Sequence, residues 1–194
     1  NIEREDVREN AYFVPAGEPE EGAGKIVAVL KRLQQRDLDP VRDVQVYTPM
    51  HGREMGTNNL NDLLQDAINP DGEPTGHTDR RGLELRLGDP VIQTRNDREG
   101  RGVVNGMRGV LVETTSGEGV IVEFPGQHVH YTSGQIGELS MAYATTIHKG
   151  QGQEQPVSVL ALHHSEHAVM LDRSLLYVGA TRAEDMLICV ATEK

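Results

Sequence analysis

The feature that most constrains the fold is a change of hydrophobic period near residue 88, with a return to the first period after residue 137. Before the change, two short apolar segments, residues 11–16 and 44–49, each precede a stretch whose apolar residues have helical spacing. Short apolar segments that alternate with amphipathic helices are typical of an α/β domain with a parallel sheet. We therefore predict such a domain over residues 1–87.

The stretch from residue 88 to 137 has a different pattern. Short segments of alternating polar and apolar residues are separated by glycine-rich turns such as "REGRG", "NGMRG" and "SGEG". Closely spaced short strands predict a small antiparallel β-barrel. The segments "VSVLAL", "SLLYVGATRA" and "DMLICVAT" then restore the strand–helix–strand order, so we expect residues 138–194 to complete the α/β domain.

Composition narrows the functional classes. The net charge of −11 argues against a broad nonspecific nucleic-acid surface, although a narrow groove could still hold a strand. No apolar run approaches the ~18 residues that a membrane-spanning helix needs. The one cysteine, Cys189, lies in the apolar segment "MLICVA", which favours a buried reduced thiol and a cytoplasmic protein without a membrane partner.

Two weaker motifs do not predict sites. The segment "GEPEEGAGK" ends in Gly-Lys, but Ile26 follows Lys25 where a P-loop requires a hydroxyl residue. The three histidines of "LHHSEH" lack a second group of ligands at metal-site spacing, so we predict solvated loop histidines and no metal site. The chain begins at Asn1 within an acidic stretch, and we expect it to be part of a longer protein.

The most informative stretches are "AYATTIHKGQGQE" (142–154) and "LLYVGATRAEDML" (175–187), with a predicted strand between them. Together they resemble motifs V and VI of superfamily 1 helicases, in the RecD-like branch (the exodeoxyribonuclease V alpha subunit family). The segment "VQVYTPM" (44–50) resembles the motif IV region of that branch. The segments "GDPVIQTRND" and "VVNGMRGVLVE" resemble the SH3-like insert of its second motor domain.

This resemblance implies a RecA-like motor domain that shares ATP and Mg²⁺ with a first motor domain, which supplies the P-loop. Arg182 would be the arginine finger, because a guanidinium can meet the charge that develops during phosphoryl transfer. Glu154, with Gln151 and Gly152, would face the nucleotide, and Arg53 would be a further nucleotide contact.

The resemblance also implies residues that face single-stranded DNA, where hydroxyl, amide and cationic donors meet phosphates without reading sequence. These are Thr48, Thr146 and His148 in the motor motifs, and Asn96, Asn105 and Arg108 in the insert. An alternative for the insert is local structure alone, since Asn105-Gly106 forms a good hairpin turn.

The expected function is that of the second motor domain of an ATP-dependent DNA helicase, which translocates on single-stranded DNA and unwinds duplex. Its partners would be the first RecA-like domain and, in some assemblies, nuclease or helicase subunits of a recombination complex. The isolated chain should be inactive. Two alternatives remain open: a noncatalytic nucleic-acid- or protein-binding module with decayed motor motifs, or a conjugative relaxase or Pif-like helicase domain.

Overall fold

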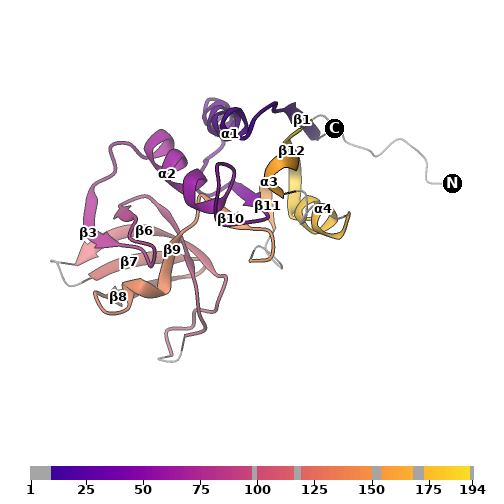
Figure 1. Cartoon of the computed structure of the whole chain (residues 1–194). Coiled ribbons are helices and arrows are strands. Elements are labelled where there is room, and N and C mark those ends of the chain that lie inside the picture. Colours follow the sequence, from indigo (N-terminus) through magenta and orange to yellow (C-terminus); the bar gives the residue numbers. More distant parts are fainter. Residues whose placement is uncertain (1–9, 98–99, 116–118, 150–153, 168–172, 193–194) are drawn as a thin grey trace.

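The described residues form two five-stranded sheets that share one apolar core, together with a two-stranded hairpin (Figure 1). The computed structural model describes residues 10–97, 100–115, 119–149, 154–167 and 173–192. Among these residues, no helix is long and apolar enough to span a membrane.

The first sheet has five parallel strands in the order β1-β12-β11-β2-β10. They are β1 (Ala11–Pro15), β2 (Val44–Thr48), β10 (Ala144–Thr146), β11 (Gln155–Leu162) and β12 (Ala183–Ala191). Every residue of β2 is buried, as expected for a central strand covered on both faces. This is the parallel-sheet core that the alternating pattern predicts.

Helices cover both faces of this sheet. They are α1 (Pro19–Gln34), α2 (Thr57–Ile68), α3 (His164–His167) and α4 (Arg173–Ala180). Side chains alternate between the faces of a strand, so Val46 packs in the cluster that holds Ile26 of α1 and Leu60 of α2. Its neighbour Tyr47 packs in the opposite cluster, against Val178 of α4.

The second sheet is antiparallel, in the order β8-β7-β6-β5-β9. Its strands are β5 (Pro90–Gln93), β6 (Arg108–Thr115), β7 (Gly119–Phe124), β8 (Gln127–Thr132) and β9 (Leu139–Met141). A short 3-10 helix, η1 (Ile136–Glu138), precedes β9. The antiparallel strands agree with the sequence pattern, and β9 continues the sheet beyond residue 137.

A hairpin of β3 (Pro74–Thr78) and β4 (Glu84–Arg86) lies between α2 and the antiparallel sheet. The sequence pattern did not predict this hairpin. Its turn is held by Asp79, which is 4% exposed and accepts hydrogen bonds from the backbone N–H groups of Arg81 and Leu83 at 2.8 and 3.1 Å. Backbone hydrogen bonds to a buried carboxylate thus hold this turn, and the strands lack the alternation of apolar residues that usually marks a strand pair.

The fully buried side chain of Asp89 ties the two sheets together. Its carboxylate accepts hydrogen bonds from Gln65 Nε2 (2.6 Å), Asn69 Nδ2 (2.8 Å) and the Tyr143 hydroxyl (2.9 Å). Burial raises the pKa of Asp89, and the donated hydrogen bonds oppose that rise. The network joins α2, the start of β5 and the chain that returns to β10, so it fixes the antiparallel sheet against the parallel one.

Candidate nucleic-acid and nucleotide sites

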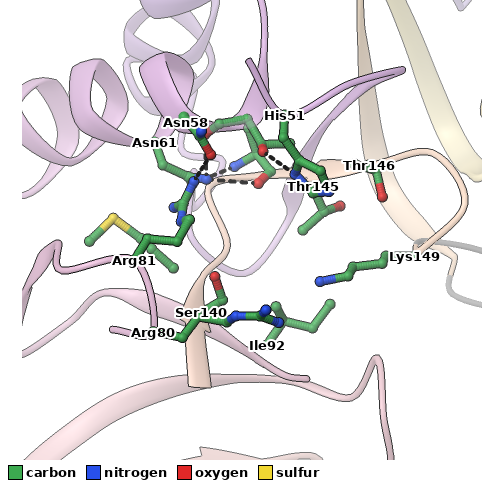
Figure 2. A pocket seen from close by; sticks show the side chains of 13 residues that line it. His51, Asn58, Asn61, Arg80, Arg81, Ile92, Ser140, Thr145, Thr146 and Lys149 are labelled. Atoms are coloured by element: carbon green, nitrogen blue, oxygen red, sulfur yellow. Dashed lines mark hydrogen bonds between the residues drawn. The ribbon is translucent and has the colours of Figure 1, made fainter. Parts of the chain in front are cut away.

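A cavity of about 230 Å³ opens beside the carboxyl end of β10 (Figure 2). It is bounded by the β2–α2 loop and the start of α2, the β3–β4 hairpin, strands β5 and β9, and β10 with the turn that follows. We call it the cationic cavity. It is lined by His51, Thr57, Asn58, Asn61, Arg80, Arg81, Ile92, Ser140, Met141, Ala144, Thr145, Thr146 and Lys149.

Strand β10 is held in place at the sheet edge by a side chain of α2. The buried Asn61 accepts a hydrogen bond from the Ala144 N–H at 2.9 Å and donates to the Ala144 carbonyl at 3.0 Å. Asn61 therefore takes the place of a further strand and satisfies backbone groups that an edge strand would leave unpaired. This fixes the three residues that lead to the cavity, Ala144 to Thr146.

The loop between β2 and α2 brings the N-terminus of α2 close to the sheet. Thr48, which is fully buried, donates its hydroxyl to the Met55 carbonyl at 2.7 Å. Gly56 lies so close to the Gly52 carbonyl oxygen that a Cβ at residue 56 would be 1.8 Å from it. The predicted DNA contact Thr48 therefore has its hydroxyl committed to this loop, and only Thr146 of the predicted contacts lines the cavity.

Arg81 is positioned by contacts on two sides. Its Nε lies 3.4 Å from Asp79 Oδ2, and its Nη1 donates to the Asn58 side-chain oxygen. The remaining Nη2 is buried and has no hydrogen-bond partner. A buried unpaired donor is costly, so it suits a ligand that supplies an acceptor.

Two further cations of the cavity, Arg80 and Lys149, form no ion pair with the residues that the structure describes. Within the described part of the chain, no carboxylate lies within ion-pair distance of Arg80 or Lys149, and Figure 2 shows both extending into the same space. Burial and the nearby Arg80 and Arg81 lower the pKa of Lys149. Burial, with Lys149, Arg81 and Arg80, also lowers the pKa of His51. The cavity thus concentrates positive charge in a chain of net charge −11.

Glu154 and Arg182 lie together at the opposite end of the parallel strands. Gln155, the first residue of β11, donates its N–H to the Arg182 carbonyl at 2.9 Å. Arg182 follows α4, and its Nε donates to the Val178 carbonyl at 3.1 Å, which places the guanidinium at the end of that helix. Glu154 is exposed. The predicted neighbours Gln151 and Gly152 lie outside the described residues.

The remaining predicted residues lie elsewhere. Arg53 lies on the loop between β2 and α2, at the carboxyl ends of the parallel strands, and its Nη1 is 3.5 Å from the Ser165 carbonyl. It therefore lies at the opposite end of the sheet from Glu154 and Arg182. The exposed Asn105 donates its N–H to Asn96 Oδ1 at 3.0 Å, and neither residue lines the cationic cavity. His148 is exposed beside Lys149 in the turn after β10.

Arg108 occupies a different environment from the other predicted DNA contacts. Its Nη2 donates to the Val44 carbonyl at 3.2 Å, and it lines a second groove between the two sheets. The sequence pattern did not identify His51, Arg80, Arg81 and Lys149, because their convergence depends on the β3–β4 hairpin. The one local signal is the lysine within "TTIHKGQGQE".

The fold agrees with comparisons to known proteins. Residues 141–190 match the UvrD-like helicase C-terminal domain. In a structure of two coordinating Pif1 helicases that unwind forked double-stranded DNA, 48% of one chain matches 89% of this chain, with a TM-score of 0.54 and 16% identity. The parallel sheet is therefore a RecA-like core of the kind found in helicase motor domains, as predicted.

Sequence relatives place the chain more narrowly. It is 37% identical over 168 residues to the ATP-dependent RecD2 DNA helicase of Deinococcus radiodurans, which covers 87% of this chain and 22% of the relative. It is 34% identical over 107 residues to the RecBCD enzyme subunit RecD of Mycolicibacterium smegmatis. That match covers 55% of this chain and 18% of the relative. The chain is a helicase C-terminal domain of the RecD-like type, and it spans about a fifth of the length of these relatives.

Proposed function

We propose that the chain is the second motor domain of an ATP-dependent DNA helicase that moves along single-stranded DNA and unwinds duplex. In this proposal one end of the parallel sheet grips the strand and the other end meets the nucleotide. The observation that carries the proposal is the cationic cavity, because unpaired cations beside motif V are suited to backbone phosphates.

The cationic cavity would hold a backbone phosphate of the strand. Among the described residues, Arg80 and Lys149 have no carboxylate within ion-pair distance, and the buried Nη2 of Arg81 has no hydrogen-bond partner. The Thr146 hydroxyl lies at the same cavity. Contacts of this kind position a strand without reading its bases, which suits an enzyme that must step along any sequence.

The opposite end of the sheet would meet ATP. Arg182 is proposed as the arginine finger, and Glu154, with Gln151 and Gly152, as contacts on the nucleotide side. The sequence has no G-x-x-x-x-G-K-[ST] pattern, so the first RecA-like domain would hold the phosphates and Mg²⁺. Residues 147–154 connect β10 to β11, and the segment therefore links the DNA end to the nucleotide end.

The test uses the complete polypeptide that contains this chain. Single-stranded DNA should stimulate its ATP hydrolysis, and Arg182→Ala should reduce the rate by about a thousandfold or more while DNA affinity is retained. The isolated chain should bind DNA and hydrolyse no ATP. Hydrolysis by the chain alone, or a fully active Arg182→Ala enzyme, would overturn the proposal.

The same experiment separates the alternatives. A complete polypeptide that binds DNA but hydrolyses no ATP would support a noncatalytic module with decayed motor motifs. An active enzyme whose polypeptide also carries a DNA-nicking domain would support a conjugative relaxase. Assembly with further subunits of a recombination complex stays a prediction from the resemblance to RecD proteins.

A further inference from the structure

A second cavity lies between the two sheets, and we call it the junction groove. Its volume is about 660 Å³, which is within the range of sites for small ligands. The loop before β2, the turn before β6, the β7–β8 turn and the start of β11 line it. The residues that matter below are Val104, Met107, Arg108, Phe124 and Glu154.

Arg108 forms no ion pair with any described residue of this groove. Its Nη2 donates to the Val44 carbonyl at 3.2 Å, and its Nε is buried without a hydrogen-bond partner. No carboxylate among the described residues lies within ion-pair distance. Burial lowers the pKa of Arg108 to about 10. A desolvated guanidinium with an unpaired N–H favours a ligand that brings a hydrogen-bond acceptor.

The other groove residues indicate that the hydrogen-bond acceptor of the ligand is neutral and that the ligand itself is flat. The groove also holds Glu154 and Arg42, which pairs with Glu123, so its acidic and basic side chains balance and give a phosphate or carboxylate no net positive charge. Val104, which is 54% exposed, lines the groove with Met107 and the largely buried Phe124, and supplies apolar surface. A nucleobase has this combination, because its faces are apolar and its edge carries ring-nitrogen or carbonyl acceptors.

The groove is also continuous with the end of the sheet that carries Arg182. Gln155 lines the groove and donates its N–H to the Arg182 carbonyl at 2.9 Å. Tyr47 lies close enough to Arg108 and Arg182 that both positive charges act to lower its pKa, although burial raises that pKa to about 12. A ligand whose phosphates reach Arg182 can therefore extend into the groove.

We propose that the junction groove binds the nucleobase of the nucleoside triphosphate, with Arg108 donating to an acceptor on the base edge. Glu154 would accept a hydrogen bond from a sugar hydroxyl between the base and the phosphates. This inference rests on the proposed function for Arg182 and Glu154. It gives the antiparallel sheet a part in nucleotide selection, since Arg108 and the apolar wall belong to that sheet and its turns.

The first experiment measures DNA-stimulated hydrolysis of ATP, GTP, CTP and UTP by the complete polypeptide. Arg108→Met should raise the KM for ATP about tenfold, the usual effect of losing one hydrogen bond from a charged donor, and should leave kcat within about twofold. Inhibition by inorganic tripolyphosphate, which has no base, should not change. Arg95→Met removes a charge from an exposed part of the same insert and should change neither constant.

A second measurement does not depend on the folding of a variant. Photolabelling of the wild-type polypeptide with 8-azido-ATP should attach the label to residues 104–110 or 123–126. Labelling of neither segment in an active enzyme, or an unchanged KM with a raised Kd for DNA in Arg108→Met, would overturn the inference. An active Arg182→Ala enzyme would overturn the proposed function instead, so the two failures are distinguishable.

Discussion

Two groups of cations in this chain differ in their partners. In the connection between β5 and β6, Arg101 Nε lies 2.9 Å from Asp97 Oδ1, and its Nη2 lies 2.8 Å from Glu138 Oε2. Its guanidinium carbon is 4.8 Å from the centre of the Tyr131 ring. In the cationic cavity, by contrast, Arg80 and Lys149 share space with no carboxylate within ion-pair distance among the described residues.

The difference indicates two uses of the same charge. Arg101 is surrounded by opposite charge and by an aromatic face, so it stabilises the insert in the absence of any ligand. Arg80 and Lys149 repel each other, and burial adds to the cost, as the lowered pKa of Lys149 shows. Side chains that destabilise the free protein in this way are explained by a ligand that offsets the cost.

The largest effect should come from the paired arginine. Arg101→Met removes the cation that pairs with Asp97 and Glu138, whose side chains are 3% and 13% exposed, and leaves Glu138 a 3.8 Å contact with the exposed Arg95. We expect the free energy of unfolding to fall by about 3 kcal/mol. Urea denaturation of the chain measures this, with Arg36→Met in the exposed turn after α1 as the control. A loss below about 1 kcal/mol would mean that the pairing is not what stabilises the insert.

The unpaired cations should show the opposite pattern. Arg80→Gln combined with Lys149→Gln should raise the Kd for single-stranded DNA about tenfold. It should also make the slope of log K against log[salt] shallower by about 0.7, the contribution of one neutralised phosphate. Stability should be unchanged or higher, because a repulsion is removed. Lys31→Gln with Arg32→Gln removes the same charge from the exposed surface of α1. Equal effects from both double variants would contradict a defined phosphate site.

The smallest effect concerns pH. In the free chain, burial and Lys149, Arg81 and Arg80 lower the pKa of His51, so its neutral form is favoured. A bound phosphate favours the charged form and raises that pKa. DNA affinity should therefore increase as pH falls from about 7.5 to about 5.5, by a few fold for one group. Fluorescence anisotropy measures the Kd across this range, and His51→Gln should flatten the curve. An unchanged slope in the variant would remove His51 from the site.

The fold was predictable where the signal is local. The alternation of apolar segments with amphipathic helices predicts the parallel core, because burial of one face imposes a period on each element. The Asn105-Gly106 pair predicts a turn for a similar reason, since Gly106 has a φ of +91° that other residues avoid. The β3–β4 hairpin was missed because its turn is held by hydrogen bonds to Asp79 and not by apolar alternation.

The site residues also divide into those that contiguous motifs locate and those that only the fold brings together. The sequence by itself determined the class of domain and the positions of Thr146, Glu154 and Arg182, because these residues belong to contiguous motifs at the ends of strands and a helix. Only the tertiary structure decided which cations gather around Thr146 and that Arg108 turns into the junction groove. These arrangements depend on contacts between residues far apart in sequence, such as Asp79 with Met141 and Arg108 with Val44. Residues whose charges converge in this way are not spaced periodically in the sequence. Only the packing of the folded chain brings them together.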